Sequence, residues 1–278
     1  MRDLKFFKIM GEKVPCLGMG TWRIGGGFLS PDYSMDREWI AVLRRGLELG
    51  MTLIDTAEVY GGGHAEELVG EAIKGFPRDE IFIVSKVWPD NATRKGVLKA
   101  TKASVKRLGT YIDLYLLHWP AEGVPICETM KAMEELVDKG LVRHIGLSNF
   151  EVKEIEKARN CLSKVDIAAV QNRHSLMYRR YEKDVIPYCA REGMMFMSYT
   201  PLEKGLLARD RFLAEIGEKY GKTAAQVALN WLICIEPVVA IPKAARLSHL
   251  EENAGAMGWR LSREDWELIS RKFRQYLY

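Results

Sequence analysis

The chain has 278 residues, of which 47% are hydrophobic and 28% are charged, the balance of an ordinary soluble globular protein. Its 41 Lys and Arg residues nearly balance its 37 Asp and Glu residues, and the formal charge of +4 comes without a dense basic run. Nucleic acid and membrane surfaces are therefore not expected partners. The apolar stretches are too short to cross a bilayer, and the first residues lack the apolar segment of a secretory signal.

The cysteines are spread along the chain, with no CxxC pair and no histidine placed as a zinc partner: Cys16, Cys127, Cys161, Cys189 and Cys234. Widely spaced cysteines of this kind are typical of reduced thiols in a cytosolic protein. We therefore expect a cytoplasmic protein whose thiols stay reduced and which binds no metal.

The chain begins with a predicted β-hairpin, in which segments 4–9 and 13–15 flank a turn at Gly11. Downstream, short apolar runs alternate with amphipathic stretches. The runs predict strands at 53–54, 81–84, 112–117, 144–147, 167–170, 195–198 and 238–240. The stretches predict helices at 64–74, 93–108, 124–138, 152–160, 181–191 and 247–254, and a last helix follows Ser262 toward Phe273.

A polar residue closes each run except the last, which Ile241 follows, and together with Thr21 these residues recur at intervals of roughly 30 positions, the size of one βα unit. Eight such units build a (β/α)₈ barrel of about 250 residues. Strands that are apolar throughout suit burial on both faces. We therefore predict an α/β protein with one (β/α)₈ TIM-barrel domain over 1–278, whose N-terminal hairpin closes the barrel bottom. An open doubly wound sheet is the alternative.

In such a barrel, the residues just past the carboxyl ends of the strands line the active site. Tyr60 lies five residues after Asp55, on the glycine-rich loop 58–63. The other polar side chains expected at this mouth close the runs themselves: Asp55, Lys86, His118, Ser148, Asn149, Gln171 and Tyr199.

Four of these side chains suggest proton transfer to a carbonyl group. A free tyrosine has a pKa of about 10, and a Lys86 ammonium nearby is expected to lower the pKa of Tyr60. Asp55 would keep Lys86 charged and in place, and His118 would donate a hydrogen bond to a substrate oxygen. Taken singly, each residue is more simply a surface charge, a helix cap, a turn residue or a core histidine. The presence of all four at the strand ends of one barrel favours a proton donor whose pKa is adjusted by its neighbours.

Several motifs resemble those of the aldo-keto reductase family. Residues 55–66, DTAEVYGGGHAE, resemble the family signature DTAxxYGxGxxE. The likeness continues in order over nearly the whole chain, through GMGTW at 18–22, SKVW at 85–88, LLHWP at 116–120, GLSNF at 146–150, SYTPL at 198–202, IPK at 241–243 and EN at 252–253.

The resemblance implies an NAD(P)H-dependent reductase of aldehydes and ketones, in which the cofactor supplies a hydride. It implies that Tyr60 is the proton donor, that Lys86 and Asp55 tune it, and that His118 orients the carbonyl. The cofactor would be bound by Thr21, Trp22, Ser148, Asn149, Gln171, Tyr199, Pro201, Leu202, Gly205, Leu206, Ile241, Lys243, Ala245, Arg246, His249, Glu252 and Asn253.

Within this set the resemblance assigns separate parts of the cofactor. Ser148, Asn149 and Gln171 would hydrogen-bond the carboxamide, Tyr199 would stack on the nicotinamide ring, and residues 201–206 would lie under the pyrophosphate. The substrate pocket would be lined by Trp22, Trp88 and Trp119, although core packing is the default explanation for a single tryptophan.

The cofactor tail departs from the family pattern. Many members hold the 2′-phosphate of NADP with a Lys-Ser pair and a later Arg, whereas this chain keeps Lys243 but has Ala244 and His249 at the other two positions. Losing a planar bidentate donor weakens phosphate recognition. Arg246 is close enough in sequence to substitute. NADP(H) is therefore favoured, and use of NAD(H) stays open.

Three other classes were weighed. Residues 18–23 half-match the GxGxxG of a Rossmann dehydrogenase, but Arg23 replaces the third glycine and no YxxxK is present. A metal-dependent hydrolase would need clustered ligands, whereas the histidines are scattered. A cofactor-binding regulatory or sensor protein on the same barrel, with little turnover, is the remaining alternative.

The sequence does not name the substrate. The chain past the last helix leaves no long C-terminal flap, so we expect an open pocket mouth and broad specificity. We expect a monomer whose partner is a small carbonyl compound.

Overall fold

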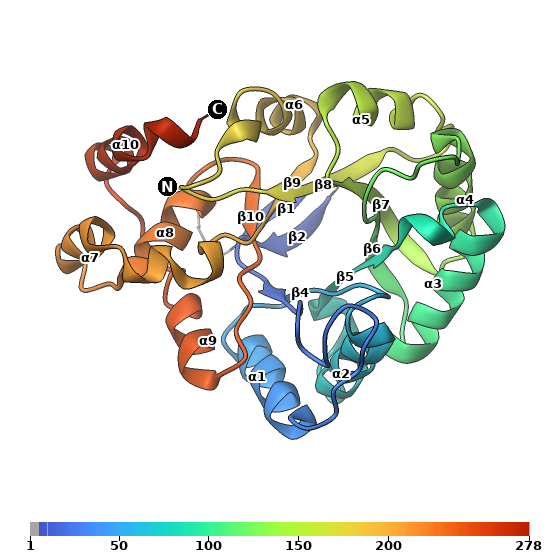
Figure 1. Ribbon diagram of the computed structural model, residues 1–278, viewed down its shortest axis with the longest axis horizontal. Coiled ribbons are helices and arrows are strands. Elements are labelled where there is room, and N and C mark those ends of the chain that lie inside the picture. The colour runs from blue at the N-terminus through green and yellow to red at the C-terminus, as the bar shows by residue number, and fades with distance from the viewer. Residues whose placement is uncertain (1–5, 10, 278) are drawn as a thin grey trace.

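Eight parallel strands curl around a central axis, with helices outside them (Figure 1). The computed structural model describes residues 6–9 and 11–277. The strands follow one another around the sheet in chain order. They are β3 (Met19–Gly20), β4 (Leu53–Asp55), β5 (Phe82–Val87), β6 (Ile112–Leu117), β7 (Val142–Ser148), β8 (Ile167–Arg173), β9 (Met195–Tyr199) and β10 (Val238–Ala240).

Backbone hydrogen bonds between the first and the last strand close the sheet. The Gly18 amide donates to the Ala240 carbonyl over 2.9 Å, and the Gly20 amide donates to the Pro242 carbonyl over 3.1 Å. Glycine is needed at position 20 because a Cβ there would lie 2.9 Å from the Ile241 carbonyl oxygen. The predicted (β/α)₈ barrel is confirmed, and an open doubly wound sheet is excluded.

The helices cover the outer face of the barrel, and each predicted helix has a counterpart. Three further helices, α1, α7 and α8, were not predicted. The full set is α1 (Asp36–Glu48), α2 (His64–Ala72), α3 (Arg94–Leu108), α4 (Ile126–Asp138), α5 (Val152–Arg159), α6 (Val185–Glu192), α7 (Arg211–Glu218), α8 (Ala224–Ile233), α9 (Leu247–Ala254) and α10 (Arg263–Lys272).

Local chemistry explains where two of these helices begin. The Thr93 side chain caps α3 by accepting from the Gly96 amide over 3.2 Å. The predicted start of α6 at 181 is wrong, because Arg180–Glu182 forms a separate 3₁₀ turn. The Asp184 side chain then accepts from the Val185 amide over 2.6 Å, and α6 begins there.

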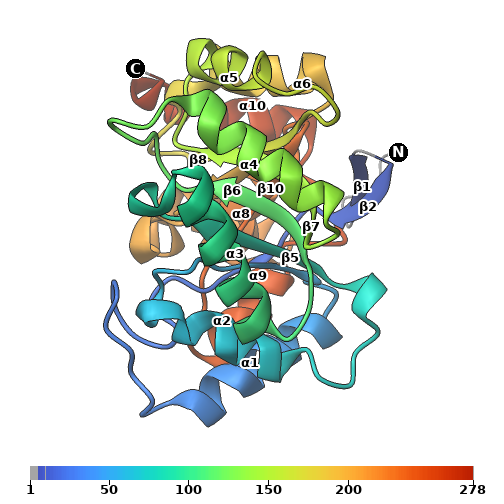
Figure 2. The same cartoon turned by 90° about the vertical axis from the view of Figure 1, so that its right-hand side faces the viewer.

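The predicted N-terminal hairpin is present as β1 (Phe6–Ile9) and β2 (Glu12–Pro15), and it closes one end of the barrel. Val14 is fully buried among inward-facing strand residues such as Leu53 and Val239. Glu12 Oε1 lies 2.6 Å from a ring nitrogen of His144, near the start of β7. In Figure 2 the hairpin lies at one end of the barrel and the long loop before α1 lies at the other.

The hairpin turn contains Gly11, whose φ of 81° lies in the left-handed region that favours glycine. Residues 4, 5 and 10 of the predicted hairpin lie outside the described part of the chain.

A disulfide joins Cys127, at the start of α4, to Cys161, just past α5. The expectation that all thiols stay reduced is therefore wrong for this pair. The two cysteines are 34 residues apart in sequence, but packing of α4 against α5 brings their Cα atoms to 5.0 Å. Cys16, Cys189 and Cys234 take no part in a disulfide within the described chain.

The C-terminal segment is fixed to the barrel after α10. A single turn, η7 (Arg274–Tyr276), follows α10, and the Tyr276 carbonyl accepts from the Arg179 amide over 2.9 Å. Across residues 6–9 and 11–277, each helix is too short or too polar to cross a bilayer.

Candidate active site

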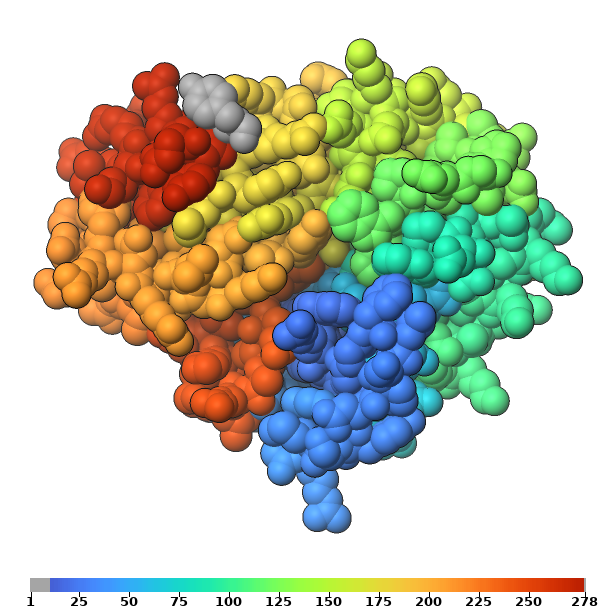
Figure 3. All heavy atoms as spheres, in the orientation of Figure 1, coloured from blue at the N-terminus to red at the C-terminus, as the bar shows by residue number. Residues whose placement is uncertain are grey.

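The carboxyl ends of the barrel strands gather the predicted site residues at the end opposite the hairpin. Parallel pairing sets their levels, since Ser148 on β7 lies beside Gln171 on β8. In Figure 3, which shows this face, the surface is hollowed between the blue N-terminal loop and the green and orange segments.

Lys86 lies at the centre of the site and is fully buried. Its ammonium donates to the Asp55 carboxylate over 2.8 Å and to the Thr56 carbonyl over 2.9 Å. The same Nζ lies 3.5 Å from the Tyr60 hydroxyl. Burial lowers the pKa of Lys86, and the charge of Asp55 opposes that shift. The predicted Asp-Lys-Tyr grouping is therefore present.

The pKa of Tyr60 is raised well above its usual value, against the expectation that Lys86 would lower it. Burial is the main cause, and the negative charge of Asp55 adds to it. Tyr60 is consequently a phenol at neutral pH, which is the protonated form that a proton donor needs.

His118 faces Tyr60, with their ring centroids 5.7 Å apart. Burial and the nearby charge of Lys86 hold the pKa of His118 well below its usual value, so the ring is neutral. Its Nδ1 is buried and has no hydrogen-bond partner within the described chain. A buried nitrogen of this kind needs a partner from outside the protein.

The predicted carboxamide-binding residues adjoin this group directly. The Gln171 amide donates to Asp55 Oδ1 over 2.7 Å. The Asn149 amide donates to the His118 carbonyl over 3.0 Å, and Tyr199 donates to Asn149 Oδ1 over 2.7 Å. Asn149 has a φ of 66°, in the left-handed region that residues other than glycine rarely adopt. Hydrogen bonds thus connect the residues predicted to bind the carboxamide with the residues predicted to transfer the proton.

Thr21 supports Asp55 from the first strand end. Its amide and its hydroxyl both donate to the Asp55 carbonyl, over 2.9 and 3.0 Å. Ile241 is buried beyond β10, where its amide donates to the Ser198 carbonyl over 3.1 Å.

Aromatic rings surround the acid-base group. Trp22 meets Tyr60 edge to face at 5.0 Å, and Trp88 meets His118 at 5.2 Å. Phe28, which the sequence analysis missed, meets Trp88 at 4.9 Å. Trp22, Phe28 and Trp119 are 41%, 45% and 43% exposed, which is unusual for large aromatic side chains. This half-exposed set forms an aromatic rim.

The backbone of loop 21–35 explains the position of Phe28. Phe28 forms an isolated β-bridge with Tyr60, and the Leu29 amide donates to the Val59 carbonyl over 2.9 Å. The Gly61 amide donates to the Gly27 carbonyl over 2.7 Å. Loop 21–35 is therefore joined to the loop that carries Tyr60.

The residues of the predicted cofactor tail lie past β10. Gly20 bridges to Lys243, which brings Arg23 near the lysine. Burial lowers the pKa of Lys243, and the positive charge of Arg23 lowers it further. The sequence analysis names Arg23 only as a mismatch to GxGxxG and does not predict that its charge acts on Lys243. Arg246 and His249 are exposed at the start of α9.

Other predicted tail and loop residues differ in their surroundings. Ala245 packs beside the small cluster around Ile24 and Trp39, and Asn253 is buried. The Glu252 carbonyl accepts from Gln226 over 3.0 Å. The predicted pyrophosphate residues Pro201, Leu202, Gly205 and Leu206 lie in the loop after β9, where Leu206 is largely exposed.

This donor set fits a nicotinamide dinucleotide. One hydroxyl and two amides at Ser148, Asn149 and Gln171 suit a carboxamide, and the phenol ring of Tyr199 suits stacking. Two cations at Arg23 and Lys243 suit phosphates. Among the described residues, no group of three or more His, Cys, Asp and Glu side chains could hold a metal ion.

Comparisons with known proteins point to one family. The family model described as "Aldo/keto reductase family" matches residues 16–273. The chain is 38% identical to the methylglyoxal reductase YeaE of Escherichia coli K12, covering 97% of this chain and 95% of that protein. It is 34% identical to a glyoxal reductase of Bacillus subtilis, covering 93% and 89%.

Solved structures agree. The thermostable aldo-keto reductase Tm1743, crystallised with the inhibitor epalrestat, is 43% identical with a TM-score of 0.91, and the match covers 96% of this chain and 98% of that one. An aldo-keto reductase of Klebsiella pneumoniae in complex with NADPH is 35% identical with a TM-score of 0.90, covering 98% and 96%. This chain belongs to the aldo/keto reductase family and is an oxidoreductase.

Proposed function

We propose that this single barrel domain reduces aldehydes and ketones to alcohols with NADPH, and that Tyr60 is the proton donor. The observation that carries the proposal is the position of Lys86 Nζ, 2.8 Å from Asp55 and 3.5 Å from the Tyr60 hydroxyl. The buried phenol can provide a proton, and the neighbouring ammonium, held by the carboxylate, can stabilise the phenolate that remains.

The proton balance follows from this arrangement. When bound, the cofactor supplies a hydride to the carbonyl carbon. The Tyr60 O–H bond breaks as its proton passes to the carbonyl oxygen, which completes the alcohol. Lys86 stabilises the phenolate, and water restores the proton. The high pKa of Tyr60 keeps the donor loaded before each turnover.

His118 orients the substrate. Its neutral ring donates an N–H to the carbonyl oxygen without adding a charge, which holds that oxygen near the Tyr60 hydroxyl. Burial of the group excludes bulk water and strengthens each of these hydrogen bonds.

Ser148, Asn149 and Gln171 bind the cofactor carboxamide, and Tyr199 stacks on the nicotinamide ring. The loop 201–206 holds the pyrophosphate, and Lys243 with Arg246 holds the 2′-phosphate. A structural neighbour crystallised in complex with NADPH supports this choice of cofactor. Ala244 and His249 stand where many family members have a Ser and an Arg that bind the 2′-phosphate. We therefore expect the enzyme to use NADH as well, but less efficiently than NADPH.

The aromatic rim binds the substrate. The rim residues Trp22, Phe28 and Trp119, together with the partly buried Trp88 beside Phe28, favour flat, apolar carbonyl compounds. Two relatives are named for methylglyoxal and glyoxal, so small dicarbonyls belong in the same test. We also propose a cytoplasmic monomer, whose Cys127–Cys161 disulfide departs from the usual reduced state of cytosolic thiols.

The deciding experiment is a carbonyl panel with both cofactors. Methylglyoxal, phenylglyoxal, glyceraldehyde and substituted benzaldehydes are added to enzyme with NADPH or NADH, and loss of reduced-cofactor absorbance is followed. Turnover supports the proposal. A cofactor-loaded protein that turns over none of these carbonyls would instead be a sensor on the same barrel.

A further inference from the structure

Glu203 is a buried carboxylate that the proposed mechanism does not use. It lies in residues 200–206, the β9 loop, which follows Tyr199 directly. The residue is 6% exposed. Ser175 donates to Glu203 Oε1 over 2.6 Å, and Arg173 forms an ion pair with the same carboxylate. Both partners lie at or just past the end of β8.

The backbone of the β9 loop is strained. Thr200, Glu203 and Lys204 have φ values of 55°, 47° and 56°. Residues other than glycine avoid this left-handed region, and they stay there only where surrounding contacts hold them. Glu203 is one of the three, so the contacts to its carboxylate act at the strained position itself.

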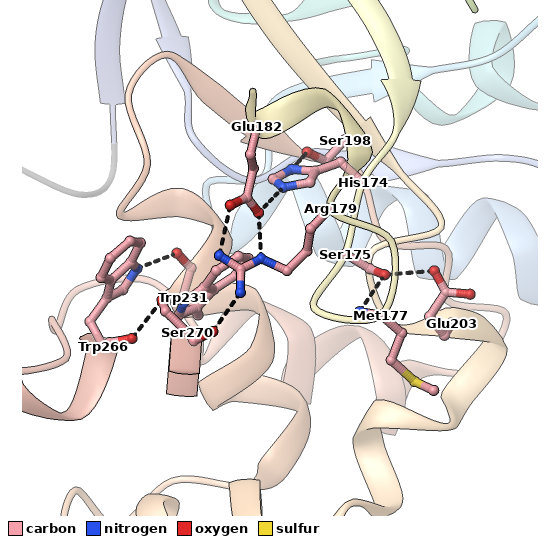
Figure 4. A network of polar contacts seen from close by, with 10 residues as sticks. All are labelled: His174, Ser175, Met177, Arg179, Glu182, Ser198, Glu203, Trp231, Trp266 and Ser270. Atoms are coloured by element: carbon pink, nitrogen blue, oxygen red, sulfur yellow. Dashed lines mark hydrogen bonds and ion pairs between the residues drawn. The ribbon is translucent and has the colours of Figure 1, made fainter. Parts of the chain in front are cut away.

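Ser175, one of the two residues that hold Glu203, is itself fixed by buried polar contacts (Figure 4). Ser175 is fully buried, and its hydroxyl accepts from the Met177 amide over 3.1 Å. The adjacent His174 is also fully buried, with one ring nitrogen 3.0 Å from Ser198 Oγ and the other 3.0 Å from Glu182 Oε1. The loop after β8 is therefore tied to β9 below the β9 loop.

Arg179 ties the same loop to the C-terminal helix. Its guanidinium donates to both oxygens of Glu182, over 2.8 and 2.7 Å, and to the Ser270 carbonyl over 2.6 Å. Trp231 donates to Ser270 Oγ over 2.8 Å. This network fixes the loop after β8 against α10 and α8. The hydrogen bond from Ser175 to Glu203 then joins that loop to the β9 loop.

We propose that Glu203 is a positioning residue that keeps the β9 loop closed on the diphosphate of a bound nicotinamide dinucleotide. This rests on the proposed function, which places the loop at the diphosphate. Arg173 has a second effect, because it neutralises a carboxylate that would otherwise repel an anionic cofactor. Without these contacts the strained loop relaxes, and the closed form becomes the minor one.

The test measures cofactor binding to Glu203→Ala, Glu203→Gln and Arg173→Ala. If the closed loop is populated about one time in ten after Glu203→Ala, the Kd values of NADPH and NADH both rise about tenfold, and their ratio stays constant. The rate of NADPH release, followed by stopped-flow fluorescence, rises with them. The KM for NADPH increases, while kcat does not fall.

Two variants separate loop anchoring from charge. Glu203→Gln keeps an oxygen that accepts from Ser175, so its Kd should rise only about threefold. Arg173→Ala leaves an unpaired carboxylate near the diphosphate, so its Kd should rise at least as much as that of Glu203→Ala.

Glu192→Ala is the matched control, because it removes a carboxylate 2.6 Å from Arg159 at the far end of α6. It should lower stability but leave both Kd values unchanged. If Glu203→Ala lowers the Tm but leaves the Kd values and the rate of NADPH release equal to those of the wild type, the positioning role is overturned. If the wild-type chain itself binds neither NADPH nor NADH, the proposed function fails, and this inference fails with it.

Discussion

Gln171 donates a 2.7 Å hydrogen bond to Asp55, the carboxylate that also accepts from Lys86. A residue proposed to hold the nicotinamide is therefore in contact with the group that tunes the proton donor. Cofactor position and proton transfer share one carboxylate, so changes at Asp55 should affect both.

Tyr60→Phe should lower the rate of reduction by about a thousandfold, because it removes the transferred proton and little else. The Kd of NADPH should stay near that of the wild type. Single-turnover measurements with excess enzyme check the chemical step directly. Substantial residual turnover would contradict the role of Tyr60.

Asp55→Asn should move the alkaline limb of the kcat/KM profile to lower pH by about one pH unit or more. Burial lowers the pKa of Lys86, and Asp55 opposes that shift, so without the carboxylate Lys86 loses its proton earlier as pH rises. Tyr60 does not set this limb, because its raised pKa keeps it protonated to higher pH.

The matched control is Asp113→Asn, which removes another buried carboxylate, 2.6 Å from Arg78. It should lower stability without moving the pH profile. An alkaline limb that stays in place in Asp55→Asn would show that Lys86 does not titrate in the reaction.

Phe28→Ala should lower kcat/KM for phenylglyoxal by about tenfold while leaving methylglyoxal nearly unchanged. The two substrates share the dicarbonyl and differ by a phenyl ring, which can pack against Phe28 and Trp88. Equal losses for both substrates would mean that Phe28 supports the loop rather than selecting the substrate.

His249→Arg should tighten NADPH binding relative to NADH, since a guanidinium can contact the 2′-phosphate in a bidentate way. Titration of both cofactors by protein fluorescence gives the ratio of Kd values. A ratio equal to that of the wild type would show that this position does not reach the 2′-phosphate.

Reduction of the Cys127–Cys161 disulfide should lower the free energy of unfolding by about 4 kcal/mol, given the 34 residues between the cysteines. For a chain of this size that corresponds to a fall in Tm of about 10 °C. The control is the Cys127→Ala/Cys161→Ala double variant, whose Tm should not respond to reductant. A reductant-insensitive wild type would indicate that the bond adds no stability.

The strand ends could be predicted because all but the last of the apolar runs stop at a polar residue. That pattern alone located Asp55, Lys86 and His118 at one end of the barrel. The direction of the Tyr60 pKa shift could not be predicted, because it depends on how completely the phenol is buried. The residue types indicate that charged groups lie near the phenol, but they do not show how far burial removes water from it.

Two further features depend on distant packing. Nothing in the spacing of Cys127 and Cys161 indicates a pair, since their approach follows from how α4 packs against α5. Phe28 reaches Trp88 because loop 21–35 takes left-handed turns, with φ values of 64° at Arg23 and 61° at Leu29. Arginine and leucine rarely adopt such φ angles, so finding them at these positions does not predict the turns.

The joining of loop 21–35 to the Tyr60 loop limits how the mouth of this barrel can be altered. Because Phe28 bridges Tyr60 and Gly61 donates to Gly27, one wall of the pocket and the proton donor move as one body. Inserting or deleting residues in that wall would displace the reacting hydroxyl. New substrate preferences are therefore best sought by exchanging side chains on a loop of unchanged length.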